Sequence, residues 1–173
     1  MAVQGDKDLS GYREAERKAF EIAPIFMQEL GDSEMTSCMH YGLAWGEGWD
    51  KPFLETAKKI EDINKELKYN EIVALQCKEK FGLANIYFEF RRKDNNYLGA
   101  IDERKKQLQR VWDIVDEFDR ITHNTCEYCG ADISENKFMT KRYISYLCED
   151  CAKKTKRKYE KVNKGEQNGK FNK

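Results

Sequence analysis

Four cysteines near the C-terminal end of the chain form two Cys-x-x-Cys pairs. The pairs are Cys126/Cys129 and Cys148/Cys151, and eighteen residues separate them. This spacing falls within the range of four-thiolate zinc sites. Each Cys-x-x-Cys turn directs two sulfurs to one point, and two such turns complete a tetrahedron around Zn²⁺. Gly130 follows the first pair and supplies the permissive backbone that such a tight turn needs. The sequence therefore predicts a structural Zn²⁺ held by these four cysteines.

Other chemistries fit the four cysteines less well. Two disulfides suit a small secreted domain, but residues 1–20 contain no apolar segment of a signal peptide. A redox pair is expected beside a βαβ pattern, and ferredoxin clusters use runs such as Cys-x₂-Cys-x₂-Cys. His123 could replace a thiolate or donate to one, although its ordinary interpretation is the end of a helix. Four protein ligands close a zinc site, so we expect no catalysis at the metal and no enzymatic activity.

Residues 34–51 carry further candidates whose roles the sequence leaves open. Cys38 and His40 could form half of a metal site, or a nucleophile with its base. No partners for them are visible, and a lone cysteine is more often a small buried apolar residue. Trp45 and Trp49 flank Gly46-Glu47-Gly48, which predicts a loop whose rings fold back onto the core. An exposed tryptophan there would be a candidate contact for a partner, whereas a buried one, which we expect, belongs to the core.

Length and composition indicate one helix-rich domain, or one domain with a small zinc lobe. The chain has 173 residues, of which 40% are hydrophobic and 36% charged, and only two prolines. No stretch approaches about 18 consecutive apolar residues, so we expect no membrane span. Reduced cysteines without a targeting segment predict a cytoplasmic protein. The oligomeric state stays open.

Hydrophobic periodicity predicts an α+β body of about three main helices and a β-hairpin, covering residues 1–122. Apolar residues at three-and-four spacing indicate the helices, which we place at residues 10–30, at 50–67 and at 95–122. Pro24 should kink the first of these or start a second short helix. Alternating apolar residues predict the two strands of the hairpin, at about 71–80 and 86–92 with a loop over 81–85.

A zinc-ribbon-like lobe is predicted to follow at residues 123–155. The third helix of the body leads directly into Cys126, so it should anchor the lobe. Residues 138–147 predict a small hairpin between the two cysteine pairs. A short helix is expected to begin at about Glu149.

The zero net charge of the chain conceals an uneven distribution. Residues 153–173 hold nine Lys or Arg and two Glu, a net charge of +7, which leaves −7 for residues 1–152. Because charged segments with few apolar residues cannot form a core, residues 156–173 are predicted to be a disordered basic tail. A basic tail on an acidic body could contact nucleic acid or an acidic protein face.

Three stretches together resemble a family of small phage and prophage proteins. They are Gly46-Glu47-Gly48-Trp49, the run from Gln76 to Gly82 with the strand residues Ile86-Tyr87, and Cys126-x-x-Cys129-Gly130. The similarity spans roughly residues 41–151 and leaves out the first helix and the tail. The family commonly continues with a Leu-Arg-Phe-Tyr type strand, where this chain has Leu83-Ala84-Asn85. The resemblance implies a phage context, therefore host cytoplasm, and by analogy an anti-CRISPR role.

Three functions follow from these observations. The leading hypothesis is a protein inhibitor that binds a host defence effector such as a Cas nuclease, supported by the acidic body, the phage resemblance and an exposed aromatic–glycine loop. The alternative is a nucleic-acid-binding zinc ribbon that uses the basic tail, with Phe138, Tyr143 and Tyr146 available for stacking. An HNH-type nuclease also has paired Cys-x-x-Cys turns, but residues 130–147 contain no histidine to act as its base.

Overall fold

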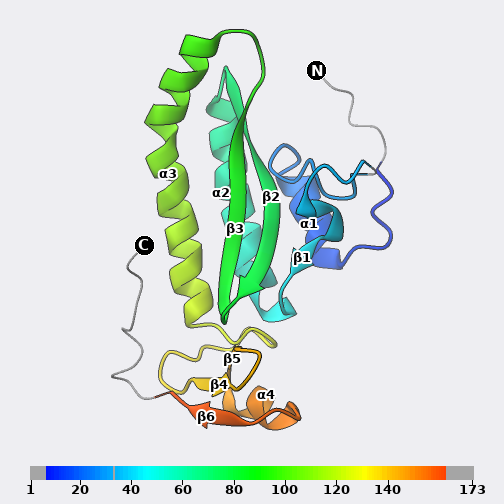
Figure 1. Ribbon diagram of the computed structural model, residues 1–173, viewed down its shortest axis with the longest axis vertical. Helices are drawn as coiled ribbons and strands as arrows, with labels where there is room; N and C mark the ends of the chain where they lie inside the picture. The colour runs from blue at the N-terminus through cyan, green and yellow to red at the C-terminus, as the bar shows by residue number, and fades with distance from the viewer. Residues whose placement is uncertain (1–6, 33, 163–173) are drawn as a thin grey trace.

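The protein has an α+β fold in which helices surround a long β-hairpin and a small four-cysteine lobe lies at one end (Figure 1). The computed structural model describes residues 7–32 and 34–162. The elements of the body are α1 (Glu14–Ile22), η1 (Cys38–Tyr41), β1 (Leu43–Ala44), η2 (Glu47–Trp49), α2 (Asp50–Glu66), β2 (Asn70–Lys80), β3 (Leu83–Arg92) and α3 (Tyr97–His123). Those of the lobe are β4 (Phe138–Thr140), β5 (Tyr146–Leu147), α4 (Glu149–Lys154) and β6 (Tyr159–Lys161). The predicted fold class is confirmed.

The hairpin is tighter than the sequence predicts. Strands β2 and β3 pair antiparallel up to Lys80 and Leu83, so only Phe81 and Gly82 form the turn. Both turn residues have positive φ, 55° and 79°, as two-residue hairpin turns that match the strand twist require. The expected loop over residues 81–85 was therefore too long, because the Leu83-Ala84-Asn85 segment joins β3. Strand β1 adds a third, parallel strand beside β2.

Helices α2 and α3 follow the predicted boundaries closely and cover the hairpin (Figure 1). Their apolar faces meet in one core, in which Phe53 of α2, Ile72 of β2 and Phe118 of α3 are at most 1% exposed. Helix α3 also holds the start of β2, since the Glu103 carboxylate accepts the N–H groups of Lys68, Tyr69 and Asn70 at 2.6–3.0 Å. Among the described residues, none of the helices combines the length and apolar character needed to cross a bilayer.

The helix predicted over residues 10–30 is wrong at both ends. Helix α1 begins at Glu14 and ends at Ile22, and turns occupy residues 24–31. The cause is Pro24, which disfavours helical geometry in the residue before it; Ala23 has φ −137° and ψ 59°. The freed N–H group of Phe26 donates to the Glu61 carboxylate of α2 at 3.0 Å instead of continuing a helix.

Candidate metal centre

The four cysteines of the two Cys-x-x-Cys pairs meet in the C-terminal lobe. The sulfurs of Cys126, Cys129, Cys148 and Cys151 all lie within 4.8 Å of one another, and none forms a disulfide. Cys129 and Cys148, one from each pair, have their sulfurs 3.7 Å apart. A tetrahedron with metal–sulfur bonds of about 2.3 Å has edges of about 3.8 Å, so this spacing fits a single ion.

Local backbone geometry explains how each pair brings its sulfurs together. In the first pair the Gly130 N–H donates to Cys126 O at 2.9 Å, and Gly130 has φ 75°, a conformation that suits glycine. The Cys126 N–H donates to Ala131 O at 2.7 Å and closes the turn. In the second pair Cys148 caps α4, and the Cys151 N–H donates to the Cys148 sulfur at 3.5 Å.

The thiols of the cluster differ in exposure and in acidity. Cys126 and Cys151 are buried, and burial raises the pKa of each thiol. Cys129 is exposed, and the backbone N–H of Ala131 lowers the pKa of its thiol. A bound cation favours thiolates at all four positions, because metals bind the deprotonated form. The sulfur-only donor set fits Zn²⁺ or an iron–sulfur cluster rather than a hard cation such as Mg²⁺.

The other candidate ligands lie apart from this cluster. Across residues 7–32 and 34–162, the only metal-type cluster is the one formed by the four cysteines. His123 ends α3, as its ordinary interpretation predicts, and its ring meets Tyr146 edge-on with centroids 5.6 Å apart. His40 lies in η1, where its Nδ1 is 2.7 Å from Asp32 O, and Cys38 beside it is exposed.

The glycine–tryptophan loop is the surface on which the first cysteine pair docks. Gly48 N–H donates to Glu127 O at 2.8 Å, and the indole N–H of Trp49 donates to Thr125 O at 3.0 Å. A Cβ on Gly48 would lie 2.1 Å from Cys126 O, so only glycine permits this approach. Two motifs that lie far apart in the sequence therefore form one interface.

Both tryptophans of this loop belong to the core. Trp49 is fully buried and Trp45 is 8% exposed, and the Trp45 ring meets the rings of Trp49 and Phe53 edge-on. The expectation of core tryptophans is confirmed. The inhibitor hypothesis drew support from the expectation that this aromatic–glycine loop is exposed. That expectation is wrong, because the lobe and the body cover the two tryptophans.

The hairpin tip makes the second contact between body and lobe. A Cβ on Gly82 would lie 2.8 Å from the Tyr146 ring and 3.0 Å from Ile144, so the β2–β3 turn sits directly on the loop before β5. Figure 1 shows the hairpin tip and the C-terminal end of α3 both reaching the lobe. The lobe is thus held at three places on the body.

The predicted disorder from residue 156 onward is wrong for residues 159–161. Strand β6 pairs antiparallel with β4, with Phe138 opposite Lys161 and Thr140 opposite Tyr159. The free edge of β4 supplies the hydrogen-bond partners, and the Tyr159 ring packs on Phe138 with centroids 5.9 Å apart. These contacts offset the high charge of the segment. Residues 163–173 of the predicted tail lie outside the described residues.

Exposed aromatic rings with cations beside them gather where the lobe meets the hairpin tip. Tyr143 is 73% exposed with the Arg157 guanidinium 5.2 Å from its ring centre. Phe81 is 69% exposed with Lys80 5.7 Å from its ring centre. We call these two pairs the aromatic–cation rim. Of the three aromatics proposed for stacking, Tyr143 alone is exposed, since Phe138 and Tyr146 are partly buried.

Two charged side chains are buried in the lobe, and the sequence pattern does not reveal either. Lys137 is 1% exposed, its Nζ lies 5.3 Å from the Tyr146 ring centre, and burial lowers its pKa to about 8. Glu127 is 6% exposed, and burial raises its pKa. Its Oε1 accepts the Gly46 N–H at 3.3 Å, which ties it to the docking loop. The Gly46-Glu47-Gly48 segment is noticeable in the sequence, but its position does not indicate a contact with Glu127.

Fold and site together define an α+β protein with a C-terminal four-cysteine metal-type site. Comparison with protein-family models, with curated proteins and with solved structures gives no match. The resemblance to small phage proteins therefore stays a prediction.

Proposed function

We propose that the four cysteines bind one structural Zn²⁺ that folds the C-terminal lobe. The sulfur spacing, the sulfur-only donors and the two-turn sequence pattern support zinc over other ions. Four thiolates around Zn²⁺ leave a net charge of −2, and the buried Lys137 cation in the same lobe offsets part of it. Four protein ligands leave no open position, so the metal supports a surface and performs no catalytic step.

The surface that the metal supports is proposed to bind single-stranded nucleic acid. The observation that carries this proposal is the aromatic–cation rim, in which two exposed rings each lie beside a cation at the junction of lobe and hairpin. Bases stack on exposed aromatic side chains, and cations beside them attract the phosphate backbone. The basic residues of segment 153–162, part of which forms β6, add positive charge to the same end of the molecule.

Backbone conformation at the rim also favours a binding role. Phe81 has φ 55°, and Arg142, next to Tyr143, has φ 77°. Bulky residues at positive φ cost free energy that Asn or Gly would avoid. The chain thus places an exposed aromatic ring at a turn position where a glycine or asparagine would be more stable, and strain of this kind is common at functional sites.

Fluorescence anisotropy with a labelled oligothymidylate of about 15 nucleotides tests this proposal. We expect the double variant Phe81→Ala/Tyr143→Ala to bind at least about tenfold more weakly, since each stacked base contributes roughly 1–3 kcal/mol. The matched control is Tyr97→Ala, which removes another exposed tyrosine beside an arginine, Arg92, at the opposite end of α3. Equal losses in the double variant and in Tyr97→Ala, or no binding by the wild-type protein, would contradict the proposal.

Inhibition of a host defence effector such as a Cas nuclease is the second candidate function. The observation that favours it is the acidic second half of α3, where Asp113, Asp116 and Asp119 follow one another within seven residues. An acidic helix can occupy a positively charged nucleic-acid channel. In a cleavage assay with a purified Cas nuclease, this protein should block DNA cleavage, and Asp113→Asn/Asp116→Asn should relieve the block. Undiminished cleavage at excess protein rules the candidate out for that nuclease.

A further inference from the structure

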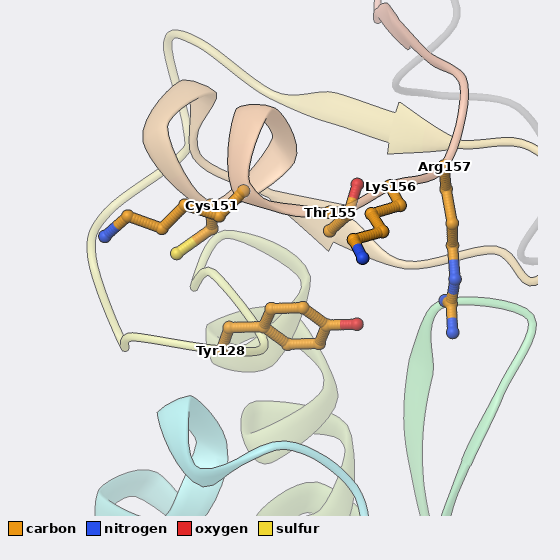
Figure 2. Close-up of a pocket in the computed structure, with 6 residues that line it drawn as sticks. Tyr128, Cys151, Thr155, Lys156 and Arg157 are labelled. Carbon is orange, nitrogen blue, oxygen red and sulfur yellow. The ribbon is translucent and has the colours of Figure 1, made fainter.

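A surface pocket of about 420 Å³ lies beside the metal centre, between the first cysteine pair and the segment after α4. Its lining combines three cations, one aromatic ring and two small polar side chains: Tyr128, Cys151, Lys154, Thr155, Lys156 and Arg157. Figure 2 shows Tyr128 facing Thr155 and Lys156, with Cys151 and Arg157 at opposite ends. No carboxylate lines the pocket, so its charge is positive.

Two of the three cations have no acidic partner among the described residues. The ion pairs found near the pocket are Lys153 with Glu149 and Lys141 with Glu160, and neither includes a pocket residue. Lys154 and Lys156 are exposed and make no ion pair with residues 7–32 or 34–162. The charges of these two lysines are therefore available to an anion. The pocket volume is within the usual range of about 300–1,000 Å³ for ligand pockets.

The pocket and the aromatic–cation rim are connected through one side chain. Arg157 lines the pocket and also lies 5.2 Å from the ring centre of Tyr143 in the rim. Tyr128, on the other wall, is 41% exposed and presents an aromatic ring inside the pocket. An anion bound here would therefore have one aromatic ring within the pocket and a second one on the rim.

We propose that this pocket binds a backbone phosphate of a nucleic-acid strand, with Tyr128 stacking on the adjoining base and the Tyr143–Arg157 pair holding the next nucleotide. This inference rests on the proposed function and specifies its site. Lys154 and Lys156 supply the charge that neutralises the phosphate. The first Cys-x-x-Cys turn carries Tyr128 between two metal ligands, so the metal fixes the position of the stacking ring.

The test is the anisotropy titration of the full, zinc-loaded chain with the same oligothymidylate across about 50–200 mM salt. We expect Lys154→Gln/Lys156→Gln to weaken binding at least about tenfold and to reduce the slope of log K against log salt by about 1.4. The matched control is Lys105→Gln/Lys106→Gln, which removes the same charge from exposed positions on α3, about 27 Å from its C-terminal end. A loss as large in this control would overturn the pocket assignment.

Two further arms separate stacking from folding and a strand from a free nucleotide. Tyr128→Ala should weaken binding at least about fivefold while Tyr128→Phe keeps it, and both should retain the metal. Unchanged binding by Tyr128→Ala would overturn the stacking role. Thymidine monophosphate and inorganic phosphate should displace the oligonucleotide only at far higher concentration, and displacement at equal concentration would assign the pocket to a small anion instead.

Failure of this inference differs from failure of the proposed function. If the wild-type protein binds the oligonucleotide and the pocket variants bind equally well, the rim binds nucleic acid and the pocket does not. If the wild-type protein fails to bind, both proposals fall.

Discussion

Gly48 is the residue on which the contact between body and lobe depends most directly. Its missing side chain lets the docking loop lie against the backbone of the first cysteine pair, where a Cβ would be 2.1 Å from Cys126 O and 2.5 Å from Gly130 N. Both neighbours are main-chain atoms of a tight turn, so neither can rotate away. A single glycine of the body thus determines how closely the lobe can approach it.

Substitution of Gly48 should therefore destabilise the protein. We expect Gly48→Ala to lower the free energy of unfolding by about 1–3 kcal/mol, because backbone atoms must shift to admit the methyl group. Gly11→Ala is the control, since a Cβ there meets nothing within 4 Å, and it should change stability by less than about 0.5 kcal/mol. Urea unfolding of the zinc-loaded proteins measures both. Equal stabilities for the two variants would show that the docking contact is looser than described.

Cysteine reactivity is a second prediction at the residue scale. Cys38 is exposed, whereas Cys77 is buried and burial raises the pKa of its thiol. With the four cluster thiolates bound to metal, one thiol should react rapidly with a disulfide reagent. Chelation should raise this number to five, and denaturant to six. Five rapidly reacting thiols before chelation would contradict metal binding by the cluster.

At the scale of elements, a single carboxylate of α3 fixes where the hairpin begins. Glu103 accepts three backbone N–H groups from Lys68, Tyr69 and Asn70, and also the Asn70 side chain at 2.9 Å. Burial alone would raise the pKa of Glu103, but these donors outweigh burial and leave its pKa below the ordinary value. The charged form is therefore favoured in the folded state.

Neutralising Glu103 should weaken the protein in a pH-dependent way. Because the folded pKa is lowered, the carboxylate contributes stability above the unfolded pKa of 4.5, and this contribution disappears as pH falls through the folded pKa. We expect Glu103→Gln to cost about 1–2 kcal/mol at pH 7 and little in strong acid. Both proteins lose the metal alike in acid, so the difference between them isolates Glu103. Asp102→Asn, at an exposed neighbouring position, is the control. A loss of stability in Glu103→Gln that persists in strong acid would refute the mechanism.

Elements with strong local patterns could be predicted from the sequence, and those that depend on distant contacts could not. Helices α2 and α3 have apolar residues at three-and-four spacing, and the two cysteine pairs have a spacing that few other sites share. By contrast, β6 exists because β4 offers a free edge, and no property of Tyr159–Lys161 itself indicates a strand. Pro24 indicated an irregularity in the first helix but not that the helix ends there, because the Glu61 carboxylate that stabilises the non-helical path is 37 residues beyond Pro24.

The binding surface was the least predictable feature, for the same reason. Phe81 was expected in a loop over residues 81–85, and only the structure shows that it forms a two-residue turn with its ring in solvent. Tyr128 and Arg157 lie 29 positions apart, and the fold of the lobe brings both to one pocket. The sequence identifies the candidate metal ligands because the two Cys-x-x-Cys pairs have a characteristic spacing. The rim and the pocket bring together residues without such a pattern, so only the fold reveals them.

At the scale of the whole molecule, the lobe and the body should respond together to metal removal. Trp49 is fully buried, and its indole N–H donates to Thr125 O just before the first cluster cysteine. Chelation should unfold the lobe, release this bond and shift tryptophan emission to longer wavelength. In Trp49→Phe the shift should be much smaller, since Trp45 and Trp112 report mainly on the body. An emission spectrum unchanged by chelation would mean that the lobe does not depend on metal.

The measurement that tests the central claim most directly is the metal content of the purified chain by native mass spectrometry. The account predicts one zinc per chain, lost in Cys126→Ser and in Cys151→Ser and retained in Cys38→Ser, because Cys38 lies outside the cluster. A chain without metal, a chain whose masses show disulfides within the two pairs, or a Cys126→Ser variant that keeps its zinc would contradict the account.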